Sequence, residues 1–247
     1  MDTWRLITTF GADPGFNMGL DEALLEDELA PPTLRLYTWE PDTLSLGYFQ
    51  KFADVPAAAG IDGRTPGALV RRITGGGAIH HVHELTFSFV APATNALYQG
   101  PIVESYKRVH AAIAAALGEL GIGAQLRGEQ QLDSDIPATG MCFHRSSELD
   151  LVWGAKKGVG SAQRRTRGRV LHHGSIKLES SIFEGSIATV RESARRVPAS
   201  EFAPLLRAAF ERVLEIKLVT GVPEPHERSR ARRLGLRYLD PDFVRRR

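Results

Sequence analysis

Three segments in the second half of the chain follow one another with only short turns between them, and each has the residue pattern of a β-strand. They cover residues 148–153, 159–165 and 169–178, and the turns carry the sequences GAKKG and RTRGR. Turns this short join strands that run in opposite directions, because a parallel connection needs a crossover of a dozen or more residues. The sequence therefore predicts an antiparallel meander and argues against a strictly alternating parallel α/β fold.

Further strand patterns precede the meander. Residues 33–39 and 43–49 alternate on either side of the turn sequence EPD, which predicts a hairpin. Residues 67–73 form a strand that leads into three consecutive glycines, and residues 84–91 form a strand that leaves them. We therefore expect the middle of the chain to be mostly sheet.

Helical patterns flank these strands. An Asp-Pro start signal opens residues 14–28, and apolar residues recur there with a helical period. A proline opens an Ala-rich helix over residues 101–120, with a glycine placed to end it, and residues 200–217 form a last amphipathic helix. The predicted class is α+β, with a mixed, mainly antiparallel sheet flanked by helices.

The end of the chain is strongly basic, although the whole chain carries a formal net charge of only +2. Its last twenty residues hold eight arginines and two aspartates. Since no repeat or long linker interrupts the chain, we expect one domain over residues 1–220 and a basic tail over 221–247. The tail is either solvated and frayed or docks to an acidic macromolecule. No nucleic-acid motif accompanies it, and an acidic carrier protein would serve equally well as the partner.

The composition also indicates the cellular compartment and which cofactor sites are excluded. A single cysteine excludes an internal disulfide and a zinc site made of cysteines. No 18-residue apolar run and no secretory signal are present, which predicts a cytoplasmic protein with no membrane partner. Neither G-x-G-x-x-G nor G-x-x-x-x-G-K-[ST] occurs, so the sequence supports no standard nucleotide site, and we expect no cofactor.

The glycine turn is a candidate binding site. It consists of Gly75, Gly76 and Gly77. Glycines let backbone N–H groups approach a carboxylate, phosphate or thioester oxygen without a Cβ in the way. Arg71 and Arg72 precede the turn, but successive strand residues face opposite sides, so at most one of them should face a ligand. A tight connection without a ligand is the structural alternative.

Three histidines follow the glycines at positions 80, 81 and 83. No cysteine and no third well-spaced ligand accompany them, so we predict no metal site. His81 is the best candidate for a hydrogen-bonding or acid/base group beside the turn.

Small residues mark a possible channel in the meander. One strand carries Gly160, Ser161 and Ala162, and its partner carries His173 and Gly174. A long apolar substrate needs a channel lined by residues without bulk, and glycine in a strand marks close approach. These residues could also serve only to relieve packing against a helix.

Cys142 is the lone cysteine, and Lys157 follows it by fifteen residues. A thiolate is the nucleophilic form of cysteine, and a nearby cation such as Lys157 or Lys156 favours it. The pair suggests acyl transfer. By itself, a lone cysteine followed by phenylalanine is more often a small buried core residue.

Four segments in this order resemble the lipoate/biotin protein ligase and acyltransferase superfamily. They are PGFNMGLDEALL, LRLYTWEPDTLSLGYFQ, RRITGGGAIHH with ELTFS, and KKGVGSAQ with LHHGSI. The resemblance covers most of residues 14–178. It implies the catalytic domain shared with biotin ligases and class II synthetases, and a medium-chain acyl group or lipoate as substrate.

Within this superfamily, MCFHRSSELDLVWGAKKGVGSAQ resembles the cysteine-dependent octanoyltransferases. The resemblance places Cys142 at the position of their nucleophile. GAKK is one residue longer than the usual turn, and counting back from Gly160 favours Lys157 over Lys156 as the functional lysine. The full GGG is instead typical of many ligases. By the same resemblance, Arg72, His81 and the glycine turn would position the acyl group and its carrier.

We therefore expect an acyltransferase that moves an octanoyl group from acyl carrier protein to a lysine of a lipoyl domain, such as the glycine-cleavage H protein. Its intermediate would be a thioester on Cys142. The alternatives are an ATP-dependent lipoate:protein ligase, possibly bipartite, and a non-catalytic acyl or carrier-protein binding module. Only 69 residues follow Leu178, which is little room for the accessory domain that single-chain ligases of this superfamily carry.

Overall fold

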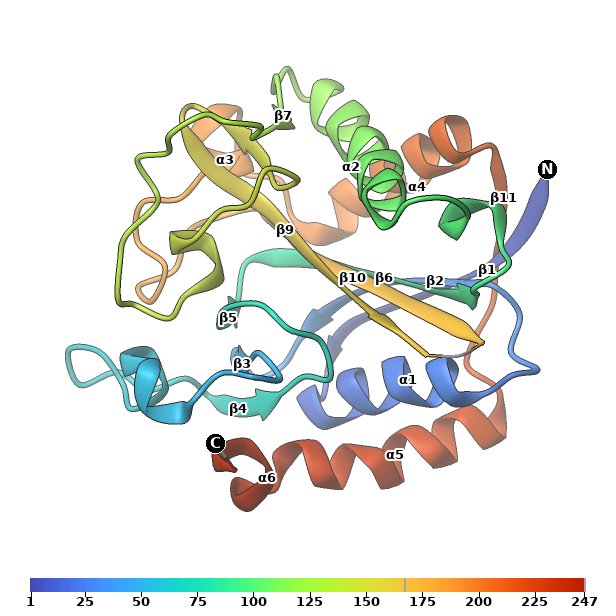
Figure 1. The fold of residues 1–247 in the computed structure, drawn as a ribbon, viewed down its shortest axis with the longest axis horizontal. Coiled ribbons are helices and arrows are strands. Elements are labelled where there is room, and N and C mark those ends of the chain that lie inside the picture. Colours follow the sequence, from blue (N-terminus) through green and yellow to red (C-terminus); the bar gives the residue numbers. More distant parts are fainter. Residues whose placement is uncertain (167, 247) are drawn as a thin grey trace.

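A large mixed sheet forms the centre of the protein (Figure 1). The computed structural model describes residues 1–166 and 168–246. In spatial order the sheet consists of β11 (Ile216–Thr220), β1 (Asp2–Ala12), β2 (Thr33–Trp39), β6 (Glu84–Pro92), β10 (Arg169–Lys177), β9 (Lys156–Arg165), β8 (Leu151–Trp153) and β7 (Gln125–Leu126). The pairs β11–β1 and β1–β2 are parallel and the other pairs are antiparallel. The predicted mixed, mainly antiparallel sheet is confirmed.

A second, smaller sheet lies beside the first. It contains β4 (Ala68–Arg71), β3 (Thr43–Leu46) and β5 (Ile79–His81), in that order. Four 3-10 turns complete the irregular regions: η1 (Phe52–Asp54), η2 (Pro56–Ala58), η3 (Ala96–Tyr98) and η4 (Cys142–His144). The glycine turn connects the small sheet's strands β4 and β5.

Helices cover both faces of the large sheet (Figure 1). Helices α1 (Pro14–Glu26) and α5 (Pro225–Leu239) lie on one face, and α2 (Ile102–Gly118) and α4 (Ala199–Leu214) lie on the other. The short helices are α3 (Val190–Ser193) and α6 (Pro241–Arg245). The main apolar core fills the space between the sheet and the α2–α4 pair, where Phe87, Phe89 and Phe210 pack together. No helix in the described part of the chain is long and apolar enough to cross a bilayer.

The predicted antiparallel meander of β8, β9 and β10 is confirmed. The predicted hairpin over residues 33–39 and 43–49 is wrong. β2 is paired on both sides, with β1 and β6, while β3 belongs to the small sheet. Because both edges of β2 already have their hydrogen-bond partners, β3 has no free edge to pair with there. The sequence did not reveal this, since strand β1 itself was not predicted.

The predicted helices are present with shifted ends. Asp13 caps α1 by accepting a hydrogen bond from the backbone N–H of Phe16, at 2.8 Å. The last predicted helix ends earlier than residue 217, because Ile216 and Leu218 are buried as part of strand β11. Strands β1, β5, β7 and β11 were not predicted.

The solvated or frayed reading of the basic tail is wrong for residues 225–245, which form α5 and α6. Ala231, Gly235 and Tyr238 make a buried stripe on α5 that packs against α1. Arg230 and Arg237 pair with Glu26 and Glu22 of α1. The high arginine content hid this stripe in the sequence. Arg247, and Arg167 in the predicted turn RTRGR, lie outside the described residues.

The α1–α5 contact gives a test of the fold. A Cβ added at Gly19 would lie 2.1 Å from the carbonyl oxygen of Ala231, whereas one at Gly118 meets no atom within 4 Å. We expect Gly19→Ala to lower the free energy of unfolding by about 1–3 kcal/mol through overpacking. The control Gly118→Ala should raise it by roughly 0.5–1 kcal/mol. Urea denaturation measures both, and equal stability of the two variants would contradict the packing described.

Candidate functional site

Cys142 lies where the two sheets meet, at the start of η4. Its backbone N–H donates to the carbonyl of Ala78 at 2.7 Å, and the N–H of Ala78 donates to Gly140 at 2.8 Å. A Cβ at Gly77 would lie 2.7 Å from the backbone nitrogen of Cys142. The third glycine of the turn is therefore needed, because the segment 140–145 that carries Cys142, here called the cysteine loop, packs directly on it. The thiol is partly exposed.

Lys157 reaches Cys142 from strand β9. Its Nζ lies 3.5 Å from Sγ of Cys142 and donates to the carbonyls of Cys142 (3.0 Å) and Arg145 (3.2 Å). It also forms an ion pair with Oδ2 of Asp150 at 2.9 Å. Burial opposes the charge of this ammonium, but the cysteine thiolate and Asp150 outweigh it, so the pKa of Lys157 is raised. Lys157 is thus a buried cation beside the sulfur at neutral pH.

Lys156 points elsewhere. Its Nζ pairs with Glu192 at 3.2 Å on the surface. The geometry therefore selects Lys157 as the lysine of the site, in agreement with the count from Gly160. Asp150 was not predicted, because one acidic residue beside a strand carries no sequence signal that distinguishes it from a surface residue.

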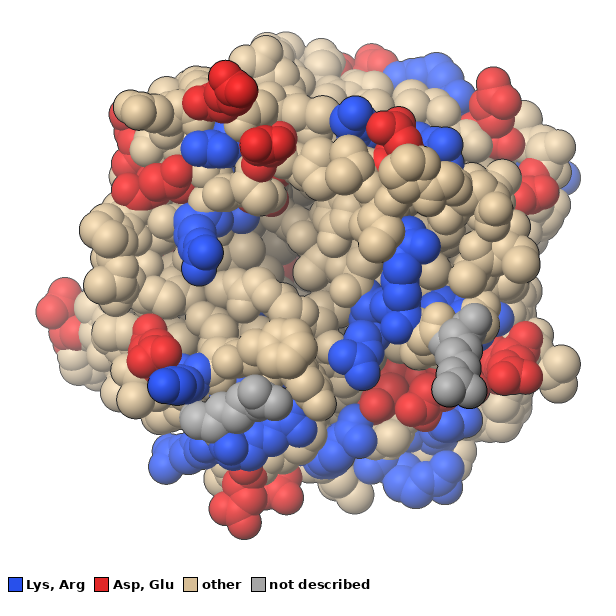
Figure 2. Space-filling model, viewed as in Figure 1, with Lys and Arg blue, Asp and Glu red and all other residues tan. Residues whose placement is uncertain are grey.

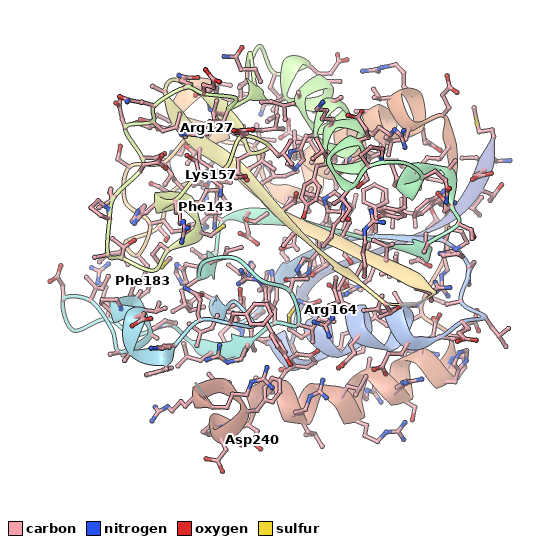
Figure 3. All side chains as sticks on the ribbon, viewed as in Figure 1. Arg127, Phe143, Lys157, Arg164, Phe183 and Asp240 are labelled. Atoms are coloured by element: carbon pink, nitrogen blue, oxygen red, sulfur yellow. The ribbon has the colours of Figure 1, made fainter. Side chains whose placement is uncertain are left out.

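The side chain of Phe143 holds the cysteine loop against the protein interior. Its ring is fully buried, with the Nζ atoms of Lys157 and Lys177 at 5.5 and 4.9 Å from the ring centroid. Figure 3 shows Phe143 beside Lys157. Lys177 is itself held by Glu84 (2.9 Å) and Glu184 (2.8 Å). A buried ion cluster thus supports the segment that presents the thiol.

An apolar cavity opens beside the sulfur. Its lining residues are Met18, Tyr37, Trp39, Arg72, Gly75, Gly76, Ile79, His81, Thr86, Cys142, Gly160, Ser161, Ala162, His173, Gly174 and Ser175. Of the predicted substrate-binding residues, only Gly77 is not in this lining; it lies in a neighbouring outer groove. Met18, Tyr37, Trp39, Ile79, Thr86 and Ser175 were missed, because they meet only in three dimensions.

Gly160 makes the cavity accessible to the thiol. A Cβ there would lie 2.9 Å from Cε of Lys157 and 3.5 Å from Sγ of Cys142. In register across the sheet, Gly160 faces Ser175, Ser175 faces Thr86, and Thr86 faces Tyr37. The cavity therefore follows one row of residues across four strands, with its small side chains next to Cys142.

Arg72 holds the glycine turn in shape. Its guanidinium donates to the carbonyls of Gly75 (3.0 Å), Gly77 (2.6 Å) and Ser45 (2.9 Å). Burial lowers the pKa of Arg72 to about 10, so it stays protonated at neutral pH. Arg71 instead bonds to Gly47, Gln50 and Val244, which ties helix α6 to the region of the turn. Only one of the two arginines faces the cavity, as the strand alternation predicted.

His81 is a neutral wall residue. Burial lowers its pKa to about 4. Its Nε2 lies 2.7 Å from Oγ of Ser45, and its Nδ1 lies 2.6 Å from Oε1 of Glu84. Since Arg72 also donates to Ser45 Oγ, the serine hydroxyl donates to Nε2, and Nδ1–H donates to Glu84. Both ring nitrogens are engaged, which disfavours a proton-transfer role for His81.

His173 and Ser161 are also fixed by hydrogen bonds. Nε2 of His173 lies 2.6 Å from Oγ1 of Thr74, and its Nδ1 lies 3.2 Å from Asp21 of α1. Oγ of Ser161 lies 2.8 Å from Nε2 of His110 and 3.1 Å from Nε2 of His172. These contacts fix the positions of the His173 and Ser161 side chains.

An outer groove reaches the same cysteine from solvent. Its lining includes Gln50, Gly77, Arg145, Asp150 and Lys157, together with Cys142. Figure 2 shows a hollow on this face, with basic side chains on both of its sides. Cys142 therefore lies between an open groove and an apolar cavity.

The one group of possible metal ligands in the described ranges lies away from this site. It comprises Asp27, which directly follows α1, and His226 and Glu227 of α5. Glu227 is already paired with Arg5 at 2.6 Å. The histidines at the glycine turn do not form such a group among the described residues.

The sequence is similar to known proteins over nearly its whole length. The model of the lipoyl protein ligase A/B catalytic domain matches residues 13–210. The octanoyltransferase LipM of Moorella thermoacetica is 34% identical over 271 aligned residues, covering 100% of this chain and 99% of the relative. The LipM of Kyrpidia tusciae is 36% identical, covering 92% of this chain and 83% of the relative.

Solved structures share the fold. A putative lipoate protein ligase, Ta0514 of T. acidophilum, has a TM-score of 0.78 at 24% identity and covers 100% of both chains. Lipoate-protein ligase A bound with ATP has a TM-score of 0.78 at 23% identity and covers 99% of both. The predicted lipoate-ligase type of fold is confirmed.

The buried His110 gives a pH-dependent test of the site's support. Burial lowers its pKa to about 4 in the folded chain, whereas an unfolded histidine titrates near 6.5. The unfolded state therefore binds more protons between these values, and stability should fall as the pH is lowered from about 6.5 to 4. We expect His110→Gln to reduce this loss by up to roughly 3 kcal/mol. Urea denaturation at several pH values measures it, and an equally steep loss in the variant would contradict the assignment.

Proposed function

Because the chain belongs to the family of lipoyl protein ligase A/B catalytic domains, we propose that it transfers an octanoyl group through a thioester on Cys142. The similar proteins of Moorella thermoacetica, Kyrpidia tusciae and Bacillus subtilis are octanoyltransferases, and this chain is an acyltransferase. The observation that carries the proposal is the 3.5 Å approach of the Lys157 ammonium to Sγ of Cys142, at the mouth of an apolar cavity.

In the first step, the thiolate of Cys142 attacks the carbonyl carbon of an octanoyl thioester on acyl carrier protein. A new C–S bond forms, the carrier's C–S bond breaks, and the carrier leaves as a thiolate that takes up a proton. Lys157 supplies a fixed cation close to the sulfur, which stabilises the thiolate and the developing oxyanion. The octanoyl chain occupies the apolar cavity, and the carrier's arm approaches along the outer groove.

In the second step, the ε-amine of a lysine on a lipoyl domain attacks the Cys142 thioester. The C–N bond forms, the C–S bond breaks, the amine loses a proton, and the cysteine is restored. A solved structure with a similar fold is that of a bi-partite lipoate protein ligase and its E2 lipoyl domain from Thermoplasma acidophilum, which supports an acceptor of this kind. The glycine-cleavage H protein is one candidate. The open groove gives both carriers access to one thiol in turn.

The acyl-enzyme is tested by intact mass. After incubation with octanoyl-acyl carrier protein and no ATP, we expect the chain to gain the mass of one octanoyl group, and Cys142→Ala to gain none. Labelling that persists in Cys142→Ala, or that requires ATP, would contradict the mechanism. Exchange of ATP with pyrophosphate in the presence of free lipoate would instead indicate the ligase alternative.

The two adjacent lysines provide a matched pair for the second prediction. We expect Lys157→Met to slow acylation of Cys142 by about 10²–10³-fold, the usual effect of removing one fixed donor. Lys156→Met should stay within about twofold of the unmodified chain, because its side chain pairs with Glu192 on the surface. Rapid-quench mass spectrometry gives both rates per folded molecule, with circular dichroism as the check. Equal rates for the two variants would remove Lys157 from the mechanism.

A further inference from the structure

Positive charge surrounds one exposed phenylalanine beside the glycine turn. The side chain of Phe49 is 66% exposed, and a Cβ at Gly75 of the turn would lie 3.9 Å from its ring. Four exposed basic side chains lie on the segment that carries Phe49 or against it, namely Lys51, Arg164, Arg245 and Arg246. We call these four residues together with Phe49 the basic surface. Figure 2 shows basic side chains to the right of the hollow and below it.

Aromatic rings hold the basic surface together. The guanidinium carbon of Arg164 lies 5.5 Å from the ring centroid of Tyr48, and that of Arg246 lies 4.5 Å from the same centroid. The guanidinium carbon of Arg245 lies 5.0 Å from the ring centroid of Phe52. Strand β9 and the end of helix α6, which are far apart along the chain, therefore meet on the one segment that follows β3.

The charge of the basic surface is not neutralised within the part of the chain that the structure describes. No described carboxylate lies within ion-pair distance of its four cations. On α5, by contrast, Arg230 and Arg237 pair with carboxylates of α1. The aspartates of α6 lie at its start, where Asp240 accepts from the backbone N–H of Asp242, and Figure 3 shows Asp240 away from Arg164. Unpaired positive charge of this kind attracts an acidic partner.

The basic surface stands at some distance from the thiol. Arg164 follows Gly160 by four residues on β9, so the two positions lie roughly 13 Å apart along the strand and face the same side. A Cβ at Gly160 would lie 3.5 Å from Sγ of Cys142. A protein that carries its thioester on a long prosthetic arm can rest at this distance while the arm reaches the sulfur. An acceptor lysine has a shorter side chain, so its domain must come closer to the thiol.

Arg71 ties the basic surface to the active-site turn. Its guanidinium donates to the carbonyl of Val244 in α6 at 2.9 and 2.6 Å, and to the carbonyl of Gly47 at 2.8 Å. Gly47 in turn packs on the glycine turn, because a Cβ there would lie 2.0 Å from the carbonyl oxygen of Gly76. A partner held by α6 is therefore held in a fixed position relative to the cavity.

We propose that the basic surface is the docking site of the donor, a protein with an acidic surface that presents the acyl thioester on a flexible arm. The proposal rests on the proposed function, because it assumes that the donor is a carrier protein. The cations steer and orient the partner, and Phe49 gives an apolar contact at the centre. The basic end of the chain thus serves the donor step of the reaction.

Reversal of charge separates docking from chemistry. The double variant Arg245→Glu with Arg246→Glu changes α6, and Arg164→Glu changes β9. If the double variant does not fold, glutamine replaces glutamate at both positions. Arg228→Glu is the matched control, because Arg228 is also exposed and lies roughly 16 Å along α5 from the end of that helix. Each protein is acylated by octanoyl-acyl carrier protein and by octanoyl-pantetheine, which has the arm without the protein, and intact mass gives the rates at several salt concentrations.

We expect the second-order rate of acylation by octanoyl-acyl carrier protein to fall by at least about tenfold in the double variant and in Arg164→Glu, with a weaker salt dependence. The rate with octanoyl-pantetheine should stay within about twofold, as should both rates in Arg228→Glu. An unchanged rate with the carrier protein would overturn the docking site. An equal loss with both donors would also overturn it, because the damage would then lie in the glycine turn.

Two further measurements separate the donor from the acceptor and docking from catalysis. Transfer from the acylated enzyme to a lipoyl domain should stay within about twofold in every variant, and a loss confined to this step would overturn the assignment to the donor. Binding of fluorescently labelled carrier protein without an acyl group is followed by anisotropy. Charge-dependent binding with no acylation in any protein would support the docking site and overturn the proposed function.

Discussion

The buried ammonium of Lys157 is the interaction on which the site depends. A buried charge is costly unless it is paired and hydrogen-bonded, so the chain must bring partners to it. Asp150 supplies the counter-charge, and the carbonyls of Cys142 and Arg145 complete the shell. Because these carbonyls accept hydrogen bonds from the Lys157 ammonium, the cysteine loop is held in place. The thiol of Cys142 therefore lies beside the ammonium.

The glycines then determine what can reach the thiol. Gly77 lets the cysteine loop lie directly on the turn, and Gly160 leaves the strand beneath Sγ without a side chain. Arg72 keeps the turn in shape through its carbonyls. The sulfur therefore has an apolar cavity on one side and an open groove on the other. This arrangement suits an enzyme that holds an acyl chain in the cavity while a donor and an acceptor protein bind in turn at the groove.

Local patterns predicted much of the fold, including the meander, the helices that flank the sheet, and the glycine turn that follows β4. They failed where pairing is decided at long range. The hairpin at residues 33–49 was wrong because β1 and β6 take both edges of β2. The basic tail was misread because its buried stripe, with Ala231 and Tyr238, becomes visible only when α1 lies against it.

By itself the sequence determined which reactive and small residues are available for a site: one cysteine, a lysine fifteen residues later, and small residues at strand positions. The tertiary structure decided which lysine faces the sulfur, since Lys157 and Lys156 differ only in the side of β9 on which they lie. It also decided the counter-ion and the cavity wall. Asp150 directly precedes β8 and Trp39 ends β2, and no spacing along the chain shows which side chains meet at the site.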